Sequence, residues 1–483
     1  MADGSTKRVI VDGVDFSHIL QFPKVLRSVT AAMQPPRLVL GLLIVVLLGA
    51  PGRLWDGMRK AEIAPGGLLA EPWSYEAQAE LQDILVSALD AYVDPADQPS
   101  STGRVRASSA LRSIEAGYRA QRAAVSVDAG DETAVAEQRR RDEVFEAVCA
   151  EIESHAPLGA FEATLLQLGR SVQRLARGVL KLRPTEVYGA VGDVAVRVPR
   201  ALWQRERAFA IIFGLIALVV VSLGGVALCR MAACDFAGHE RLRVWDAIDF
   251  AFGNLVRVVL TPVLPMVLAG VGAVLLILFG LLLLPVLDLV GGLLYGLAIL
   301  VGFLLAFILI GYAIGLPLLL PAVACENCDP ADAFQRSYAY VLNRPVHLLG
   351  YVIVAAFGLA LGYVVVATFA TTALNLTGGL VRVIGGSSGA LSAAGGFGVF
   401  DLVPAAPSTV EAAWHDRMAG AGVAFWQGVV VQLVGAYLVS YAFTSATLIY
   451  LQMRRLCDGQ DPRDIWRPGM LPGTRVPVPA SPV

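Results

Sequence analysis

This sequence of 483 residues carries little charge, with Asp, Glu, Lys and Arg making up only 16%. Soluble globular domains carry about 25%. Hydrophobic residues account for 56%, and the mean hydropathy is +0.63. These values exclude an ordinary soluble domain and indicate an integral membrane protein. The formal net charge of −2 gives no reason to expect nucleic acid as a partner.

Cysteine is also scarce, and six residues in this length do not form a disulfide framework. Cys325 and Cys328 form a CxxC pair, which could supply two of the four ligands of a structural zinc site. Cys229, Cys234 and His239 could supply the others. Their spacing is not that of a standard zinc motif, and cysteine also packs as a small hydrophobe. We predict no cofactor and keep these five residues as zinc candidates beside the packing interpretation.

Catalytic signatures are missing too. The chain has no HExxH, no P-loop and no GxSxG elbow. The segment "HDR" at 415–417, near Glu411, fits either a small hydrolytic site or a solvated surface. We therefore predict no catalytic residue and no enzyme.

Long apolar runs are abundant. A helix needs about 20 mainly apolar residues to cross the bilayer core, and six regions qualify: 37–55, 208–228, 260–284, 289–320, 346–374 and 423–450. Between Val258 and Ala324 the only charge is Asp288, which follows Pro285. We place Asp288 at a turn near the membrane surface, because a carboxylate inside the bilayer is expensive.

Lys and Arg in the short loops set the orientation. The N-terminal segment, the loops after the second and fourth runs and the C-terminal tail are all basic, and six crossings put them on one side. We predict a multi-pass protein of the bacterial inner (plasma) membrane, embedded in the lipid bilayer, with both termini cytoplasmic.

Two long segments then lie outside the cytoplasm. The first, 56–205, has helical periodicity, which predicts an extracytoplasmic helical domain. One stripe in it consists of Leu81, Ile84, Leu85, Ala88, Leu89 and Tyr92, and a second of Phe161, Leu165, Leu168, Val172, Leu175 and Val179. We expect both to form a core, with a partner surface as the alternative. The second segment, 375–422, is a Gly-rich outer loop.

An internal repeat organises the spans. "LRSVTAAMQPPRLVLGLLIVV" from Leu26 aligns without gaps with "QRSYAYVLNRPVHLLGYVIVA" from Gln335, and "WDAIDFAFGNLVRVVLTPVLP" is a looser third copy. Each copy has a short amphipathic helix and then a span. In the helix that leads into the Gln335 copy, Phe334, Tyr338, Val341 and Leu342 share one face, and Arg336 lies away from it. This apolar face can lie on the inner headgroup region of the membrane. Asp329 can cap this helix, Pro330 suits its first position, and Pro345 ends it near Arg344.

The fold prediction is an all-α polytopic membrane protein. It has about six transmembrane helices in three hairpin units, each preceded by a cytoplasmic amphipathic helix, and an extracytoplasmic helical insertion. The predicted segments are a cytoplasmic N-terminal segment with an amphipathic helix (1–36), a first span (37–55), the outer domain (56–205), the remaining spans (206–452) with amphipathic helices near 243–258 and 330–344, and a disordered cytoplasmic tail (453–483).

The stretch "LPLLLPAVACENCDPADAFQRSYAYV" resembles the P…E…(D/A)AF.RS pattern of the membrane-anchor domain of some glycerophosphodiester phosphodiesterases. The resemblance covers roughly 200–460, and related uncharacterised bacterial membrane families share the pattern. The chain has no phosphodiesterase catalytic domain, and 56–205 does not belong to the pattern. The resemblance therefore implies a type of fold and no activity.

Two functions fit the sequence. The first is a non-enzymatic scaffold or envelope-associated protein, whose outer helical domain in 56–205 binds another envelope protein. The second is a transporter or lipid-handling protein with a path between the hairpins.

Overall fold

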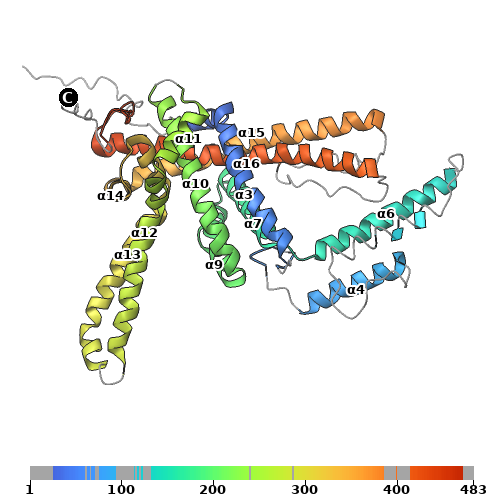
Figure 1. Cartoon of the computed structure of the whole chain (residues 1–483), viewed down its shortest axis with the longest axis horizontal. Coiled ribbons are helices and arrows are strands. Elements are labelled where there is room, and N and C mark those ends of the chain that lie inside the picture. The colour runs from blue at the N-terminus through green and yellow to red at the C-terminus, as the bar shows by residue number, and fades with distance from the viewer. Residues whose placement is uncertain are drawn as a thin grey trace, which may run out of the picture. The chain divides into compact units, whose positions relative to one another are not determined.

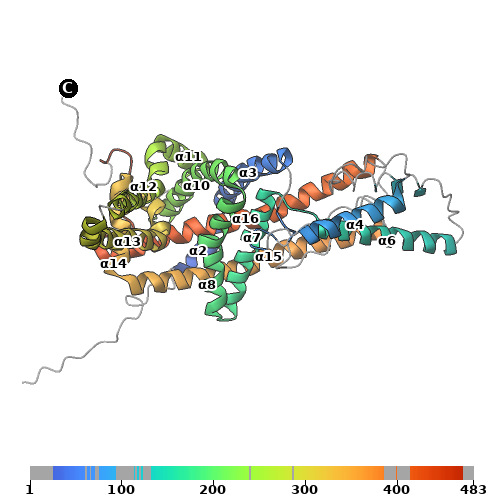
Figure 2. The same cartoon turned by 90° about the horizontal axis from the view of Figure 1, so that it is seen from below.

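The computed structural model describes residues 25–59, 63–65, 67–70, 75–93, 114, 117–118, 121–122, 132–238, 241–284, 288–385, 399 and 414–471. Within these ranges the regular structure is helical, and an isolated bridge pairs Ile63 with Leu158. Figures 1 and 2 show the helices from two directions. The all-α prediction is confirmed for the part of the chain that is described.

Six of the described helices are long and apolar enough to cross a membrane, as the sequence predicts. They are α3 (Pro35–Met58), α10 (Arg207–Phe236), α12 (Leu255–Phe279) with the 3-10 turn η3 (Gly280–Leu283), α13 (Asp288–Glu326), α15 (Pro345–Gly385) and α16 (Trp414–Asp458). A helix suits the bilayer because it pairs every backbone N–H and C=O within its own segment. The chain is thus a multi-pass helical membrane protein.

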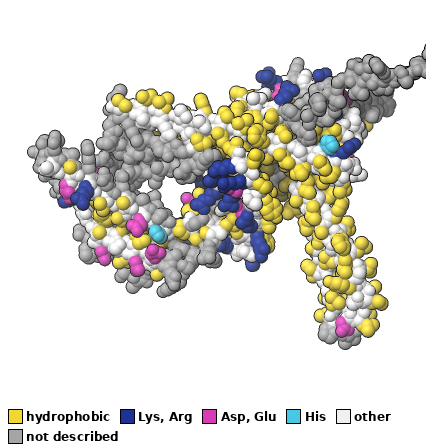
Figure 3. Space-filling view, turned by 180° about the vertical axis from the view of Figure 1, so that it is seen from behind, with side chains coloured by type: hydrophobic (Ala, Val, Ile, Leu, Met, Phe, Trp, Pro, Cys, Tyr) yellow, Lys and Arg dark blue, Asp and Glu magenta, His cyan; other side chains and the backbone are white. Residues whose placement is uncertain are grey.

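The α12 and α13 helices pack along each other and expose apolar side chains over most of their surface, which Figure 3 shows in yellow. Such an outward apolar surface suits a lipid environment. Asp288 is exposed at the first position of α13, and its Oδ1 accepts a hydrogen bond from the Leu289 N–H at 2.9 Å. The carboxylate therefore lies at the helix end, as predicted.

Short helices precede three of the spans. α2 (Arg27–Ala32) leads into α3, α11 (Val244–Gly253) into α12, and α14 (Pro330–Asn343) into α15. The last two occupy the predicted positions near 243–258 and 330–344. The buried residues of α14 are Ala333, Ser337, Tyr338, Tyr340 and Val341. Of the predicted apolar face, Tyr338 and Val341 are buried and Leu342 is 55% exposed. The membrane-surface position of these helices and the repeat itself remain predictions.

The outer segment forms α4 (Tyr75–Tyr92), α6 (Glu132–His155), α7 (Ala160–Leu180), α8 (Pro184–Gly192), the π-helix η2 (Asp193–Arg197) and α9 (Val198–Arg205). The apolar stripe of α4 is buried in a core with Ile114, Tyr118, Phe145 and Ile152. The stripe of α7 is buried only in part, because Phe161 belongs to one core and Val179 packs against another. Leu165 is 56% exposed, while small and polar residues such as Ala163, Gln167 and Ser171 are buried.

Two helix boundaries differ from the predicted segments. α15 continues to Gly385 and α16 begins at Trp414, so helices extend into both ends of the predicted loop 375–422. The sequence criterion for a span detects the apolar part of a helix, whereas a helix continues wherever its backbone stays paired. Beyond Asp458, residues 459–471 are described and contact the helices, and 472–483 lie outside the described residues.

The chain divides into two compact units. One comprises 1–40, 222–359 and 439–483, and the other comprises 41–221 and 360–438. The first unit holds the polar clusters that are described next. The second holds α4, α6 and α7–α9.

Candidate functional site: a buried arginine cluster at the end of α13

The cluster begins where α13 ends. Asn327 has a positive φ of 52°, a left-handed conformation that Asn adopts more readily than most residues and that stops the helix. Its N–H still donates to the Val323 carbonyl at 2.8 Å. The last carbonyls of any helix lack partners within the helix. Those of Ala324 and Cys325 therefore need donors from elsewhere.

Arg230 of α10 and Trp466 of the C-terminal segment supply these donors. Arg230 Nη1 donates to the Ala324 carbonyl at 2.9 Å, and the Trp466 N–H donates to the Cys325 carbonyl at 2.8 Å. Arg230 Nη2 also donates to the Trp466 carbonyl at 2.8 Å. Its guanidinium lies 4.9 Å from the Phe250 ring centroid and 5.7 Å from that of Trp466. A cation here also complements the negative end of the helix dipole.

Glu326, the last residue of α13, is 7% exposed and is surrounded by donors. It forms ion pairs with Arg336 of α14 and, at 3.5 Å, with Arg454 of α16. The Tyr450 hydroxyl donates to its Oε1 at 2.7 Å. Burial alone lowers the pKa of Arg336, but the attraction of Glu326 and neighbouring groups outweighs it, and the net shift is upward. One carboxylate therefore joins three helices.

Arg454 extends the cluster to the C-terminal segment. Its Nη2 donates to the carbonyls of Asp461, at 3.0 Å, and Asp464. The Tyr340 hydroxyl donates to Asp458, and burial together with this bond raises the pKa of Tyr340. These contacts fix residues 461–466 against the ends of α13, α14 and α16.

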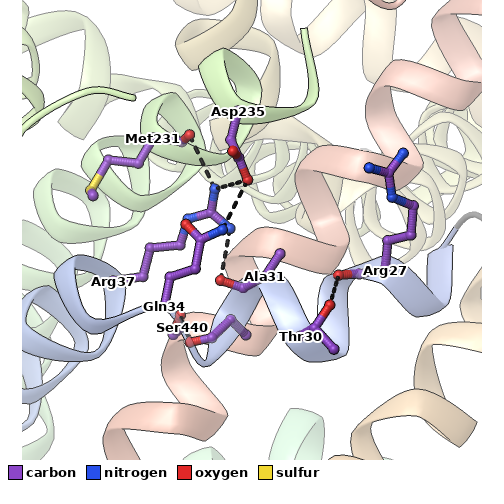
Figure 4. A network of polar contacts seen from close by, with 9 residues as sticks. Arg27, Thr30, Ala31, Gln34, Arg37, Met231, Asp235 and Ser440 are labelled. Carbon is purple, nitrogen blue, oxygen red and sulfur yellow. Dashed lines mark hydrogen bonds and ion pairs between the residues drawn. The ribbon is translucent and has the colours of Figure 1, made fainter. Parts of the chain in front are cut away.

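A second cluster in the same unit is centred on Arg37 of α3, whose side chain is 1% exposed. Its guanidinium donates to the Ala31 carbonyl at 2.9 Å, the Met231 carbonyl at 3.3 Å and the Asp235 carboxylate at 3.0 Å. Figure 4 shows Arg37 and Asp235 pointing toward each other from α3 and α10. The ion pair connects two spans at their ends.

At the start of α14 the sequence predictions hold in part. The helix begins at Pro330 and ends at Asn343, as predicted. Asp329 occupies the N-cap position, but its side chain caps no backbone N–H. The carboxylate instead lies 3.0 Å from Arg257 of α12. Arg336, which we expected away from the apolar face, forms an ion pair with Glu326.

The zinc candidates are not gathered into a site in the described part of the chain. Cys229, Cys234, Cys325 and Cys328 are buried, and no three His, Cys, Asp or Glu side chains there are grouped as metal ligands. His239 lies outside the described residues. Burial, and then the negative charge of Glu326, raise the pKa of Cys328 to about 12, so its thiol is neutral at physiological pH. Buried neutral thiols pack as small hydrophobes.

The cluster holds elements together. Its charged groups are matched to one another or to helix-end carbonyls, and this is the arrangement of a structural joint. Two of its members, Glu326 and Arg336, are the charged letters of the sequence pattern "E…RS". Sequence reasoning used Arg37, Arg230 and Arg454 only to assign orientation. The sequence signal that could have identified these three residues is an arginine at the end of an apolar run.

No protein-family model, curated protein or solved structure matches this chain.

Proposed function

We propose that this protein is a non-enzymatic membrane scaffold. In this proposal it lies in the cell inner membrane with both termini cytoplasmic and presents its α4–α6 domain to another protein of the envelope. The observation that carries the proposal is the core of that domain. Leu81, Leu85 and Leu89 of α4 pack with Tyr118 and with Phe145 of α6.

The aromatic residues give this core a defined geometry. Tyr118 stacks on Phe145 with ring centroids 4.1 Å apart, and Tyr92 meets both rings edge-on. The Tyr118 hydroxyl donates to Asp142 at 2.8 Å, and burial and this bond raise its pKa. Aromatic pairs of this type add about 0.5–1.5 kcal/mol beyond their buried area. A core of this kind can hold the α4–α6 domain in one shape, which a protein-binding surface requires.

Each of the two helices of this domain has an exposed apolar position. Val86 of α4 and Val144 of α6 are 49% and 53% exposed. Single exposed valines are ordinary, so the proposal needs a test that targets them. The buried arginine cluster adds support, because its charged groups join helices rather than line a path.

The test is purification of the tagged full-length protein from its own membrane in mild detergent, with mass spectrometry of co-purifying proteins. We expect a stoichiometric protein partner that is lost from the double variant Val86→Asp/Val144→Asp. The control is Ser87→Asp/Arg141→Asp, which introduces aspartate at exposed polar positions of the same two helices. We expect it to retain the partner.

Two outcomes overturn the proposal. A partner that stays bound after residues 75–155 are replaced by a short linker does not use this domain. Absence of any stoichiometric protein removes the scaffold function and leaves the alternative from the sequence, transport or lipid handling between the hairpins.

A further inference from the structure

The segment α7–α9 combines three features that the proposed function does not use. Residues 160–205 contain eight Lys and Arg against three Asp and Glu. All eight basic side chains are exposed, and they are Arg170, Arg174, Arg177, Lys181, Arg183, Arg197, Arg200 and Arg205. Figure 3 shows the resulting gathering of Lys and Arg near the middle of the view. We call the exposed side chains of 160–205 the α7–α9 surface.

The few carboxylates of this segment do not neutralise it. Asp193 is fully buried and lies 2.7 Å from both Arg174 and Arg197, so its charge is used inside the segment. Glu186 accepts a hydrogen bond from Arg183 at 2.9 Å. This bond and the nearby cations lower the pKa of Glu186. A net positive charge therefore remains on the surface.

The second feature is the position of the segment beside the ends of the spans. Asp56, near the end of α3, accepts the N–H groups of Phe161 at 3.0 Å and Glu162 at 2.9 Å, and so caps α7. Phe161 also packs against Phe213 of α10, with ring centroids 5.5 Å apart. Only Glu206 separates α9 from α10. Both ends of the segment are thus fixed to spans.

The contact with α15 shows how far along a span the segment packs. Ala176 of α7 packs with Ala360, Tyr363 and Ala367. Tyr363 comes 18 residues after the start of α15 at Pro345, or about 27 Å along the helix. The hydrocarbon core of a bilayer is about 30 Å thick. The segment therefore packs against α15 about one core thickness along the helix from Pro345, within the predicted span 346–374.

The third feature is exposed apolar and aromatic side chains among the cations. Leu182 is 85% exposed, Tyr188 82% and Trp203 55%, and Leu165 on the apolar stripe of α7 is 56% exposed. Tyr and Trp favour the membrane interface because one end of each ring system is apolar and the other is polar. Amphipathic helices with such a composition lie in the interface plane.

Leu182 strengthens this argument. It follows the end of α7 with a φ of 51°, a conformation that favours glycine. The turn is well formed, because the Arg183 N–H donates to the Gly178 carbonyl at 2.7 Å. Leu182 is thus an exposed leucine in a backbone conformation that favours glycine. Insertion of its side chain into the apolar part of a bilayer would explain why leucine is found here.

We propose that the α7–α9 surface binds the anionic phospholipid headgroups of the leaflet at this end of the spans. The basic side chains contact phosphate groups, and Leu182, Tyr188 and Trp203 enter the boundary between headgroups and acyl chains. Basic groups near an anionic membrane surface each strengthen binding by about fivefold.

The test is a titration of the full-length protein in detergent with phosphatidylglycerol or with phosphatidylcholine of the same acyl chains, followed by native mass spectrometry. We expect tighter binding of phosphatidylglycerol by the unmodified protein. The variant Lys181→Gln/Arg200→Gln should lose about fivefold for each charge removed. The control Arg140→Gln/Arg141→Gln removes two exposed cations from α6 and should bind as the unmodified protein does.

A second variant separates binding from folding. Leu182→Gly relieves the backbone strain, so its unfolding temperature should not fall. Its phosphatidylglycerol affinity should decrease by about tenfold through loss of a partly buried leucine. Equal affinities for the two lipids, or unchanged phosphatidylglycerol affinity in both variants, would overturn the proposal. So would binding of a short DNA oligonucleotide with the same dependence on Lys181 and Arg200, since this would identify a general polyanion surface.

Discussion

Glu326 illustrates how much single buried charges contribute at the residue scale. Its carboxylate lies between Arg336 and Arg454, and the Arg454 side chain is only 2% exposed. Removing one partner of a buried ion pair typically costs about 3–5 kcal/mol, because the other charge stays buried without compensation. The stability of this joint therefore depends on the pairing more than on either residue alone.

We predict that Glu326→Gln lowers the free energy of unfolding by about 3–5 kcal/mol. Thermal unfolding of the purified protein in one detergent measures the effect. The control Glu137→Gln breaks an exposed pair with Arg141 on α6, where both side chains are 56% exposed. Exposed pairs contribute less than about 1 kcal/mol. Equal, small changes in both variants would show that the cluster does not hold the helices.

The residue scale is also where the sequence was least informative. The partners of Arg230 are 94 and 236 positions away in the chain. Helical periodicity relates residues three or four positions apart, so it does not identify such pairs. The motif contains both Glu326 and Arg336, but the sequence gives no sign that the two side chains form an ion pair.

At the scale of elements the sequence predicted the spans well, because the bilayer imposes length and composition together. Five of the six expected runs lie within a candidate span, and the run 260–284 ends one residue beyond its span, which stops at Leu283. Burial along a helix was harder to predict. The stripe from Leu165 to Val179 on α7 is as periodic as that of α4, but periodicity does not tell which of its residues is buried: Leu165 is exposed, whereas Val179 packs against a core.

Helix packing at Gly41 gives a prediction at this scale. A Cβ atom at Gly41 of α3 would lie 2.5 Å from the backbone oxygen of Ala436 on α16, whereas one at Gly49 of the same helix would meet nothing within 4 Å. Such close approach of two helices requires a small residue. The methyl group of Gly41→Ala would collide with this backbone oxygen, so one of the two helices must shift. The methyl group of Gly49→Ala enters open space.

We expect Gly41→Ala to reduce the free energy of unfolding by roughly 1–3 kcal/mol, the usual cost of overpacking. Gly49→Ala should be neutral or slightly stabilising, because Ala favours a helix over Gly. Thermal unfolding of both variants under identical conditions gives the comparison. A Gly41→Ala protein as stable as Gly49→Ala would mean that α3 and α16 are not in this close contact.

At the scale of the whole molecule, the orientation in the membrane connects the two proposals. The α7–α9 surface puts eight Lys and Arg on the side that we predict to be outside. Basic residues usually remain in the cytoplasm, but this rule applies to loops shorter than about 60 residues, and long segments cross largely regardless of charge. The outer segment 56–205 is a long one, so the short basic loops decide the predicted orientation.

The native cysteines can test that orientation, so no cysteine has to be introduced. Cys149 and Cys457 are partly exposed, whereas Cys229, Cys234, Cys325 and Cys328 are at most 5% exposed. Thiolates, not thiols, react with maleimides. With a pKa of about 12, Cys328 stays protonated at pH 8 and becomes ionised only as the pH rises toward that value. The buried thiols should therefore react only after denaturation.

We predict that a membrane-impermeant maleimide added to intact cells labels Cys149 and that Cys457 becomes labelled only after permeabilisation. Cys149→Ser and Cys457→Ser variants assign each signal. The reverse order would place the α4–α6 domain in the cytoplasm, and the partner of the proposed scaffold would then be cytoplasmic. It would also make the leaflet contacted by α7–α9 the inner one, where anionic lipids attract basic segments near the membrane. The lipid proposal survives either orientation, whereas a scaffold for the envelope requires Cys149 outside.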